Sequence, residues 1–184
     1  ALLYACLKGR TPRQAFAIGL SYGFGLWFVG AFWLFTSIHV YGDTNAVLAV
    51  LMIAVMAIIM GLFTAVQTWL YRRFFPETPL TFAPLWVLFE WAKTWVFTGF
   101  PWLFAGYAFT ERYLDSYAPL FGVFAVSFVV IILACALVEI LNKKFFWAIP
   151  AIILLLGAWG ASFLQFVQPK AEKPLSVSLI QGNI

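Results

Sequence analysis

Residues 44–71, TNAVLAVLMIAVMAIIMGLFTAVQTWLY, contain no Asp, Glu, Lys or Arg. This run exceeds the roughly 18–20 apolar residues that a helix needs to cross the hydrocarbon core of a membrane. Three further intervals are equally free of charged residues: 14–42, 116–138 and 145–169. The sequence therefore predicts an all-α integral membrane helical bundle.

The composition agrees with this prediction. Of the 184 residues, 64% are hydrophobic and only 10% are charged, and the mean hydropathy is +0.96. Soluble domains carry about 25% charged residues. The same composition excludes a disordered chain, a disulfide scaffold and a soluble nucleic-acid binder.

Breaks at Pro, Gly and charged residues divide the chain into about five spans, a short helix and a membrane-dipping loop. Residues 1–7 resemble the tail of a helix, and the complete spans are expected at about 15–35, 46–70, 119–141 and 145–166. Asp115 and Ser116 are capping candidates for the span at 119–141. The spacings Gly19-x-x-x-Gly23 and Ala118-x-x-x-Gly122 permit close helix contact.

The segment between the spans at 46–70 and 119–141 is irregular. With Pro84 at the first helical position, residues 84–97 form a helix of about 21 Å, shorter than the roughly 30 Å hydrocarbon core. The loop that follows is apolar and broken by Gly and Pro. We expect it to dip into the membrane, where protein or a water-lined cavity must bury its backbone.

The basic residues predict the orientation, because cytoplasmic loops carry the excess of Lys and Arg. Three basic residues fall on one side of the spans, Arg112, Lys170 and Lys173, and seven on the other: Lys8, Arg10, Arg13, Arg72, Arg73, Lys143 and Lys144. We therefore expect the loops at 36–45 and 98–117 and the C-terminal end to face outward, which in a bacterium is the periplasm.

The two ends of the sequence indicate a fragment. The chain opens at Ala1, without an initiator Met or the basic start of a signal peptide. It closes after the alternating run 175–180, which is typical of a beginning β-strand. We expect a transmembrane domain at 1–168, truncated at its N-terminus, a linker at 169–174 and the first strand of another domain at 175–184.

Glu90 and Lys93 are the ionisable residues of the short helix. They lie three residues apart on one helix face, close enough to pair, and Lys93 could also extend outward to the membrane surface. An ionisable residue at mid-membrane costs about 2.5–3.5 kcal/mol, so such residues usually face an interior and serve a function. Two interpretations stay open: the pair locks the short helix to its neighbours, or it shapes a polar pocket under the loop.

The run 98–107, TGFPWLFAGY, is the most distinctive stretch. Trp and Tyr residues of membrane proteins mostly serve as interface belts and packing. Trp102 fits that role less well, because Gly99-Phe100-Pro101 fixes a non-helical backbone before it. A rigid aromatic loop at this depth is suited to contacting acyl chains or a lipid headgroup.

The other reactive side chains favour no catalytic or metal site. Cys6 and Cys135 lie at different depths and are expected to pack as small hydrophobic residues. His39 is the sole histidine and is expected in a solvated loop, where one His with scattered carboxylates makes no credible metal site. No phosphate-binding loop, dinucleotide fingerprint or nucleophile elbow is present, and no cofactor is expected.

Around this loop the sequence resembles the membrane part of bacterial apolipoprotein N-acyltransferases. One departure is Lys93, where Arg is common in the family. The resemblance covers essentially the whole chain and rests on short motifs in a fixed order: Gly23-Phe24-Gly25 with Trp33, Trp86 with Glu90, residues 98–102, Gly106-Tyr107, residues 118–123 and residues 176–184.

The resemblance implies a multi-pass protein of the bacterial inner membrane that carries a periplasmic nitrilase-like α-β-β-α domain, whose first strand is 175–184. It implies transfer of an acyl chain from a phospholipid, typically phosphatidylethanolamine, first to a Cys thioester and then to the α-amino group of a diacylglyceryl lipoprotein. The Glu-Lys-Cys triad would lie beyond Ile184, so this fragment alone is expected to be inactive. The residues expected to bind lipid are Gly99, Phe100, Pro101, Trp102, Tyr107 and Glu90.

Two other function classes stay open. One is a small transporter or channel that uses Glu90 as an intramembrane ion or proton site, which predicts further polar residues in mid-span or paired interrupted segments. The other is a membrane anchor for a separate enzyme, since relatives without the triad exist.

Overall fold

The computed structural model describes residues 1–111, 113–164 and 177–179, and within these residues the chain forms helices and no strand. The α-helices are α1 (Leu2–Leu7), α2 (Pro12–Gly30), α3 (Ala46–Phe74), α4 (Pro79–Ala92), α5 (Ala118–Leu141) and α6 (Ala148–Ala161). Short 3₁₀ or π turns lie between them: η1 (Thr36–Tyr41), η2 (Val96–Thr98), η3 (Ala105–Phe109), η4 (Tyr113–Tyr117) and η5 (Phe145–Trp147). The predicted all-helical class is thus confirmed for the described part of the chain.

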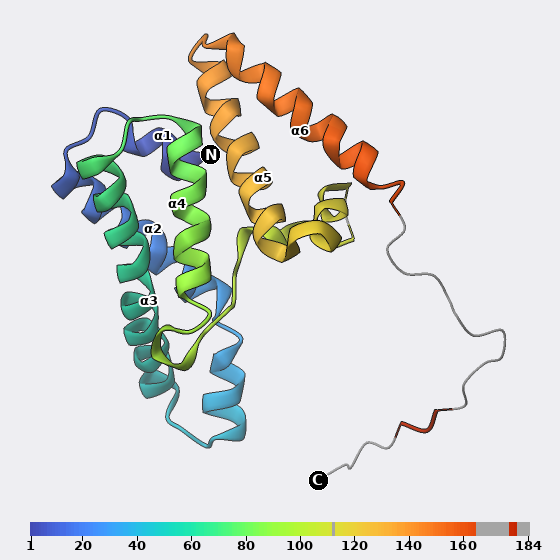
Figure 1. Cartoon of the computed structure of the whole chain (residues 1–184). Coiled ribbons are helices and arrows are strands. Elements are labelled where there is room, and N and C mark those ends of the chain that lie inside the picture. The colour runs from blue at the N-terminus through green and yellow to red at the C-terminus, as the bar shows by residue number, and fades with distance from the viewer. Residues whose placement is uncertain (112, 165–176, 180–184) are drawn as a thin grey trace.

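Figure 1 shows how the helices are arranged. α2, α3 and α4 lie together, α5 packs beside α4, and α6 leaves the far end of α5 at an angle. Among the described residues, two helical stretches are long and apolar enough to cross a membrane, Ala46–Phe74 and Tyr113–Leu141. The fold is therefore consistent with a membrane domain, while the number of about five spans stays a prediction.

The starts of α2 and α3 follow from local side-chain chemistry. Thr11 and Gln14 form a capping box, in which each side-chain oxygen accepts a hydrogen bond from the other residue's backbone N–H, and Pro12 occupies the first turn of α2. At α3, the Asn45 side chain accepts from the Val47 N–H at 2.9 Å.

α2 and α3 pack backbone against backbone. A Cβ atom added to Gly23 would lie 2.7 Å from the Cα of Gly61, so only glycine fits at this crossing. Further along the pair, the Thr68 hydroxyl donates to the Ala15 carbonyl at 2.8 Å. The close contact expected from the Gly19-x-x-x-Gly23 spacing is confirmed.

The short helix α4 has the predicted length of 14 residues, but it begins at Pro79 and places Pro84 inside. The prediction that Pro84 opens the helix is therefore wrong. The physical reason is tertiary packing, because Phe82 and Ala83, just before Pro84, are already buried in the core. The Phe82 ring lies 5.0 Å from that of Tyr71 and 5.3 Å from that of Tyr4.

Two predictions for the start of α5 are also wrong. Its N-cap is Tyr117 and no side chain caps it, because Asp115 and Ser116 lie in the preceding turn η4, where the Ser116 hydroxyl donates to the Ala158 carbonyl of α6 at 2.9 Å. Gly122 makes no close helix contact, since a Cβ there would meet nothing within 4 Å. Its φ of +71° shows its role, a kink that favours glycine.

Basic residues that the orientation argument put on one side do gather at one end of the fold. Glu139 of α5 is almost fully buried and accepts hydrogen bonds from Tyr4 and Lys8, both at 2.7 Å, with Lys144 3.1 Å away. Arg72 forms an ion pair with Glu77 and donates to the backbone next to α1. These contacts tie α1 to α5 and to the end of α3.

The predicted domain boundaries are not tested by the structure. The linker at 169–174 and most of the strand expected at 175–184 lie outside the described residues, and residues 177–179 show no regular structure. The division into domains stays a prediction.

Candidate functional site

The loop after α4 has a sharply folded backbone. Thr98 and Gly99 both take positive φ, +72° and +88°, and the Phe100 N–H returns to the Lys93 carbonyl at 2.7 Å. A Cβ on Gly99 would collide with the Thr94 carbonyl oxygen, so this turn requires glycine. The predicted non-helical backbone at Gly99-Phe100-Pro101 is confirmed.

The turn places a column of aromatic rings against the C-terminal end of α2 and the turn that follows it. Trp102 stacks on Phe100, with ring centroids 5.1 Å apart and planes within 12°. It also stacks on Trp33, at 4.6 Å and 22°. Phe100 in turn contacts the buried ring of Trp27 at 5.3 Å. The column runs from the interior of the fold to its surface, where Trp33 and Trp102 are half-exposed.

Beside the column lies an open hollow of about 420 Å³. Its walls come from the loop and from α2 with the turn that follows it, and are formed by Gly30, Trp33, Pro101, Trp102, Leu103 and Tyr107. None of these side chains is charged, and the half-exposed ring of Tyr107 is held by stacking on Phe104 at 5.3 Å. The hollow is thus an aromatic, uncharged surface.

Glu90 does not line this hollow but supports the loop from within. Its side chain is 1% exposed, and one carboxylate oxygen accepts both the Trp86 indole N–H at 2.8 Å and the Ala105 backbone N–H at 2.7 Å. Among the described residues the other oxygen has no hydrogen-bond partner. Glu90 therefore links α4 to the loop at Ala105.

Lys93 does not pair with Glu90 and does not extend outward, so both expectations are wrong. Within the described residues Lys93 makes no ion pair of 4.0 Å or less. Its ammonium group instead lies between the rings of Trp27, at 5.5 Å, and Phe104, at 5.3 Å, and the residue is 9% exposed. α4 ends at Ala92, and the fold at this point turns Lys93 toward aromatic faces that attract a cation.

Five of the six predicted site residues thus lie in one loop, with Glu90 behind them. The sequence argument missed Trp27 of α2 and Trp33 of the turn that follows it, because Trp residues of membrane proteins mostly serve as interface belts and packing. It also missed Ser127, whose hydroxyl accepts from the Gly106 N–H at 2.9 Å and holds the other end of the loop to α5. The one sequence signal for contact between α2 and the loop was Gly30 near the end of a span, where the missing side chain leaves room for Leu103.

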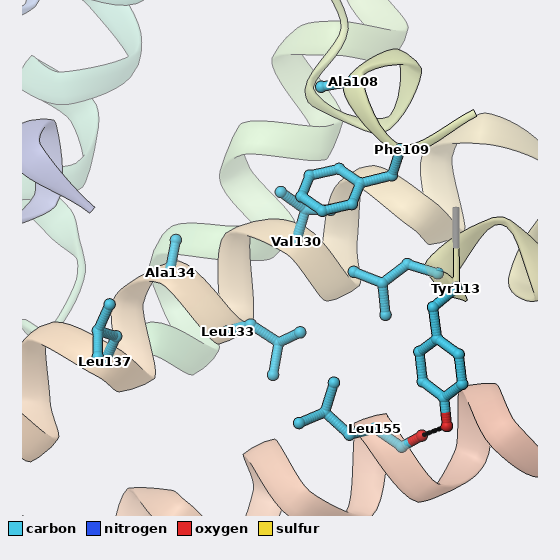
Figure 2. A pocket seen from close by; sticks show the side chains of 9 residues that line it. Ala108, Phe109, Tyr113, Val130, Leu133, Ala134, Leu137 and Leu155 are labelled. Atoms are coloured by element: carbon cyan, nitrogen blue, oxygen red, sulfur yellow. Dashed lines mark hydrogen bonds between the residues drawn. The ribbon is translucent and has the colours of Figure 1, made fainter. Parts of the chain in front are cut away.

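A larger groove of about 850 Å³ lies between α5 and α6, with Phe109 and Tyr113 at one end (Figure 2). Aliphatic side chains of α5 form its floor and Leu155 its far wall. The phenol hydroxyl of Tyr113 already donates a hydrogen bond to the Leu155 carbonyl at 2.9 Å. The groove offers no group for acid, base or nucleophilic chemistry.

The described residues hold no group of three His, Cys, Asp or Glu side chains suited to a metal ion. His39 lies in η1, half-buried, with a ring nitrogen 2.6 Å from the Thr44 carbonyl oxygen. Cys6 is exposed and Cys135 is buried in α5, and neither is in a disulfide. The aromatic loop with its Glu90 support is therefore the candidate site.

Comparison with known proteins gives a consistent result. The family model described as the apolipoprotein N-acyltransferase N-terminal domain matches residues 1–136. Proteins named apolipoprotein N-acyltransferase are 37% identical in Pseudomonas syringae pv. tomato, 36% in Pseudomonas putida and 37% in Azotobacter vinelandii, each aligned with 100% of this chain. The chain spans only 38–39% of the length of these relatives. It belongs to the apolipoprotein N-acyltransferase N-terminal domain family.

Proposed function

We propose that this chain is the membrane part of an acyltransferase that moves an acyl chain from a phospholipid to the α-amino group of the lipidated N-terminal cysteine of lipoproteins. The observation that carries the proposal is the uncharged aromatic hollow at residues 99–107, next to Trp33. Rings that are half-exposed beside an apolar wall suit contact with a lipid near its headgroup. Family membership supports the choice of reaction.

In this proposal the chemistry belongs to a nitrilase-like domain that follows the chain and begins near residues 175–184. There a Cys thiolate attacks the phospholipid ester, forms a thioester and releases a lysophospholipid, and the lipoprotein amine then attacks the thioester to give an amide and the free thiol. Glu would act as the base and Lys would stabilise the oxyanion. The protein would be multi-pass in the bacterial inner membrane with its C-terminal end in the periplasm.

The members of the proposed lipid site are Gly99, Phe100, Pro101, Trp102 and Tyr107. Gly99 and Pro101 fix the backbone, and the three rings form the surface. Glu90 acts indirectly, because its carboxylate supports the Ala105 N–H and not the hollow itself.

A transporter or channel with Glu90 as its ion site is a weaker candidate. A site that loads and releases an ion needs a carboxylate that is free to change partners. One oxygen of Glu90 is instead held by two N–H donors within 2.8 Å, and the side chain is 1% exposed and lines neither of the two hollows described above. A purely anchoring role accounts for neither the glycine-dependent turn nor the stacked rings.

The test is acyl transfer by the full-length protein carrying Trp102→Ala. We expect turnover of a phospholipid donor to fall while the protein keeps its thermal unfolding midpoint in detergent. Trp159→Ala is the matched control, because Trp159 of α6 is also an exposed ring, 57% exposed, but contacts Phe163 just beyond that helix. Unchanged turnover in Trp102→Ala would remove the loop from the mechanism.

A further inference from the structure

Trp33 reaches the loop only because α2 breaks at its outer end. On an uninterrupted helix of about 100° per residue, Trp33 would point roughly 120° away from Trp27, six residues earlier. Both rings nevertheless belong to one column, through Phe100 and Trp102. The α-helix ends at Gly30, turns follow at 31–33, and the π segment η1 begins at Thr36.

The same end of α2 approaches the loop backbone closely. A Cβ on Gly30 would lie 2.7 Å from a methyl carbon of Leu103, and Leu103 itself has a φ of +56°. A non-glycine residue with positive φ is uncommon and is kept only where its surroundings require it. Here the requirement is the fit of Leu103 over Gly30, which brings Trp102 next to Trp33.

We propose that Trp33 is a positioning residue of the lipid site, which holds the ring of Trp102 in place and forms the opposite wall of the hollow. This rests on the proposed function, because it assigns a second element, the broken end of α2, to the same site. Trp102 makes near-parallel contacts with both Phe100 and Trp33, so removal of Trp33 leaves it stacked on one ring only. Trp33 also lines the hollow directly and is 47% exposed there.

Removal of the Trp33 ring should raise KM for the phospholipid and leave kcat unchanged. Contacts that bind a substrate equally in the ground and transition states change KM alone. A stacked aromatic pair contributes about 0.5–1.5 kcal/mol beyond burial, so its loss should raise KM about 2- to 12-fold. A merely structural role would lower the fraction of active enzyme, and therefore kcat, with KM unchanged.

The experiment compares Trp33→Leu, Trp33→Phe and Trp159→Leu in the full-length protein, with a phospholipid donor of defined chain length in detergent micelles. Leu keeps apolar volume at a half-exposed position, so the variant should fold, and Phe restores a stacking ring. We expect the raised KM in Trp33→Leu, a return most of the way to wild type in Trp33→Phe, and no change in Trp159→Leu.

A double-mutant cycle with Trp102→Ala separates this inference from the proposed function. If Trp33 acts through Trp102, Trp33→Leu should add much less than its own fold-change when Trp102 is already Ala. Independent, multiplying effects would overturn the positioning of Trp102 by Trp33, because a residue that only lines the hollow gives that result. A KM of Trp33→Leu equal to that of Trp159→Leu would overturn any role of Trp33 in the site. Wild-type kinetics in Trp102→Ala would instead overturn the proposed function of the loop.

Discussion

Replacement of Glu90 is the most informative perturbation of the loop, because one carboxylate oxygen holds two different segments. It accepts the Ala105 backbone N–H at 2.7 Å and the Trp86 indole N–H at 2.8 Å, in a residue that is 1% exposed. Glu90→Ala removes the acceptor and leaves both donors without a partner. Glu90→Gln keeps an oxygen in place and removes only the charge.

The size of the effect follows from these two bonds. A fully buried donor left without a partner costs about 1–3 kcal/mol, and both donors here are part-buried, so Glu90→Ala should destabilise the fold by about 2–4 kcal/mol. Hydrogen bonds to a charged acceptor exceed neutral ones by about 1 kcal/mol, so Glu90→Gln should cost about 1–2 kcal/mol. At about 2–4 °C per kcal/mol for a chain of this size, the Ala variant should unfold several degrees below the Gln variant.

Two measurements on detergent-solubilised protein check this reasoning: the thermal unfolding midpoint, and hydrogen exchange at the Ala105 amide. The Ala105 amide should exchange faster in Glu90→Ala than in Glu90→Gln, because only Gln offers an acceptor. Equal midpoints for the two variants, together with unchanged exchange at Ala105, would refute the conclusion that Glu90 supports the loop.

Two further predictions concern the contacts between helices, each read from the thermal midpoint. Gly23→Ala should lower stability by about 1–3 kcal/mol through overpacking against Gly61. Gly25→Ala is the control and should not lower stability, because a Cβ there meets nothing within 4 Å. Equal losses in the two variants would contradict the close crossing of α2 and α3. Glu139→Gln should cost only about 0–1 kcal/mol of stability, because its ion-pair partners Lys8 and Lys144 are partly exposed. Glu139→Ala should cost about 1–3 kcal/mol more, because it leaves the Tyr4 hydroxyl without an acceptor. A larger loss in the Gln variant would show that charge dominates at this position.

The main elements of the fold could be predicted because long apolar helices depend on composition. Each charge-free interval contains a helix. The turn at Gly99 and Pro101 follows from local backbone chemistry, but the short helix before it ends at Ala92 and not at the predicted residue 97. Helix ends were less predictable. Pro79 and Pro84 both suit a first turn, and the choice between them depends on the packing of Phe82 against Tyr71, which is distant in the sequence.

Of the candidate site, only the part formed by the loop could be predicted from the sequence. Trp102 and its neighbours form one short run, so their proximity follows from the chain itself. Trp33 is far from that run, and it joins the site through a break in α2 that no proline marks. The direction of Lys93 was equally hidden, because it depends on the rings of Trp27 and Phe104 on either side.

The central claim is that residues 99–107 and Trp33 contact the acyl donor lipid, and photo-crosslinking tests it most directly. Full-length protein in vesicles of phosphatidylethanolamine, with a trace of a phospholipid carrying a photoactivatable group on its acyl chain near the ester, would be irradiated and mapped by peptide mass spectrometry. The account predicts crosslinks concentrated on peptides that contain Trp33 and residues 99–107, reduced by Trp102→Ala. Crosslinks spread along the exposed face of α3, at residues such as Leu51 and Val55, without enrichment at the loop would contradict it.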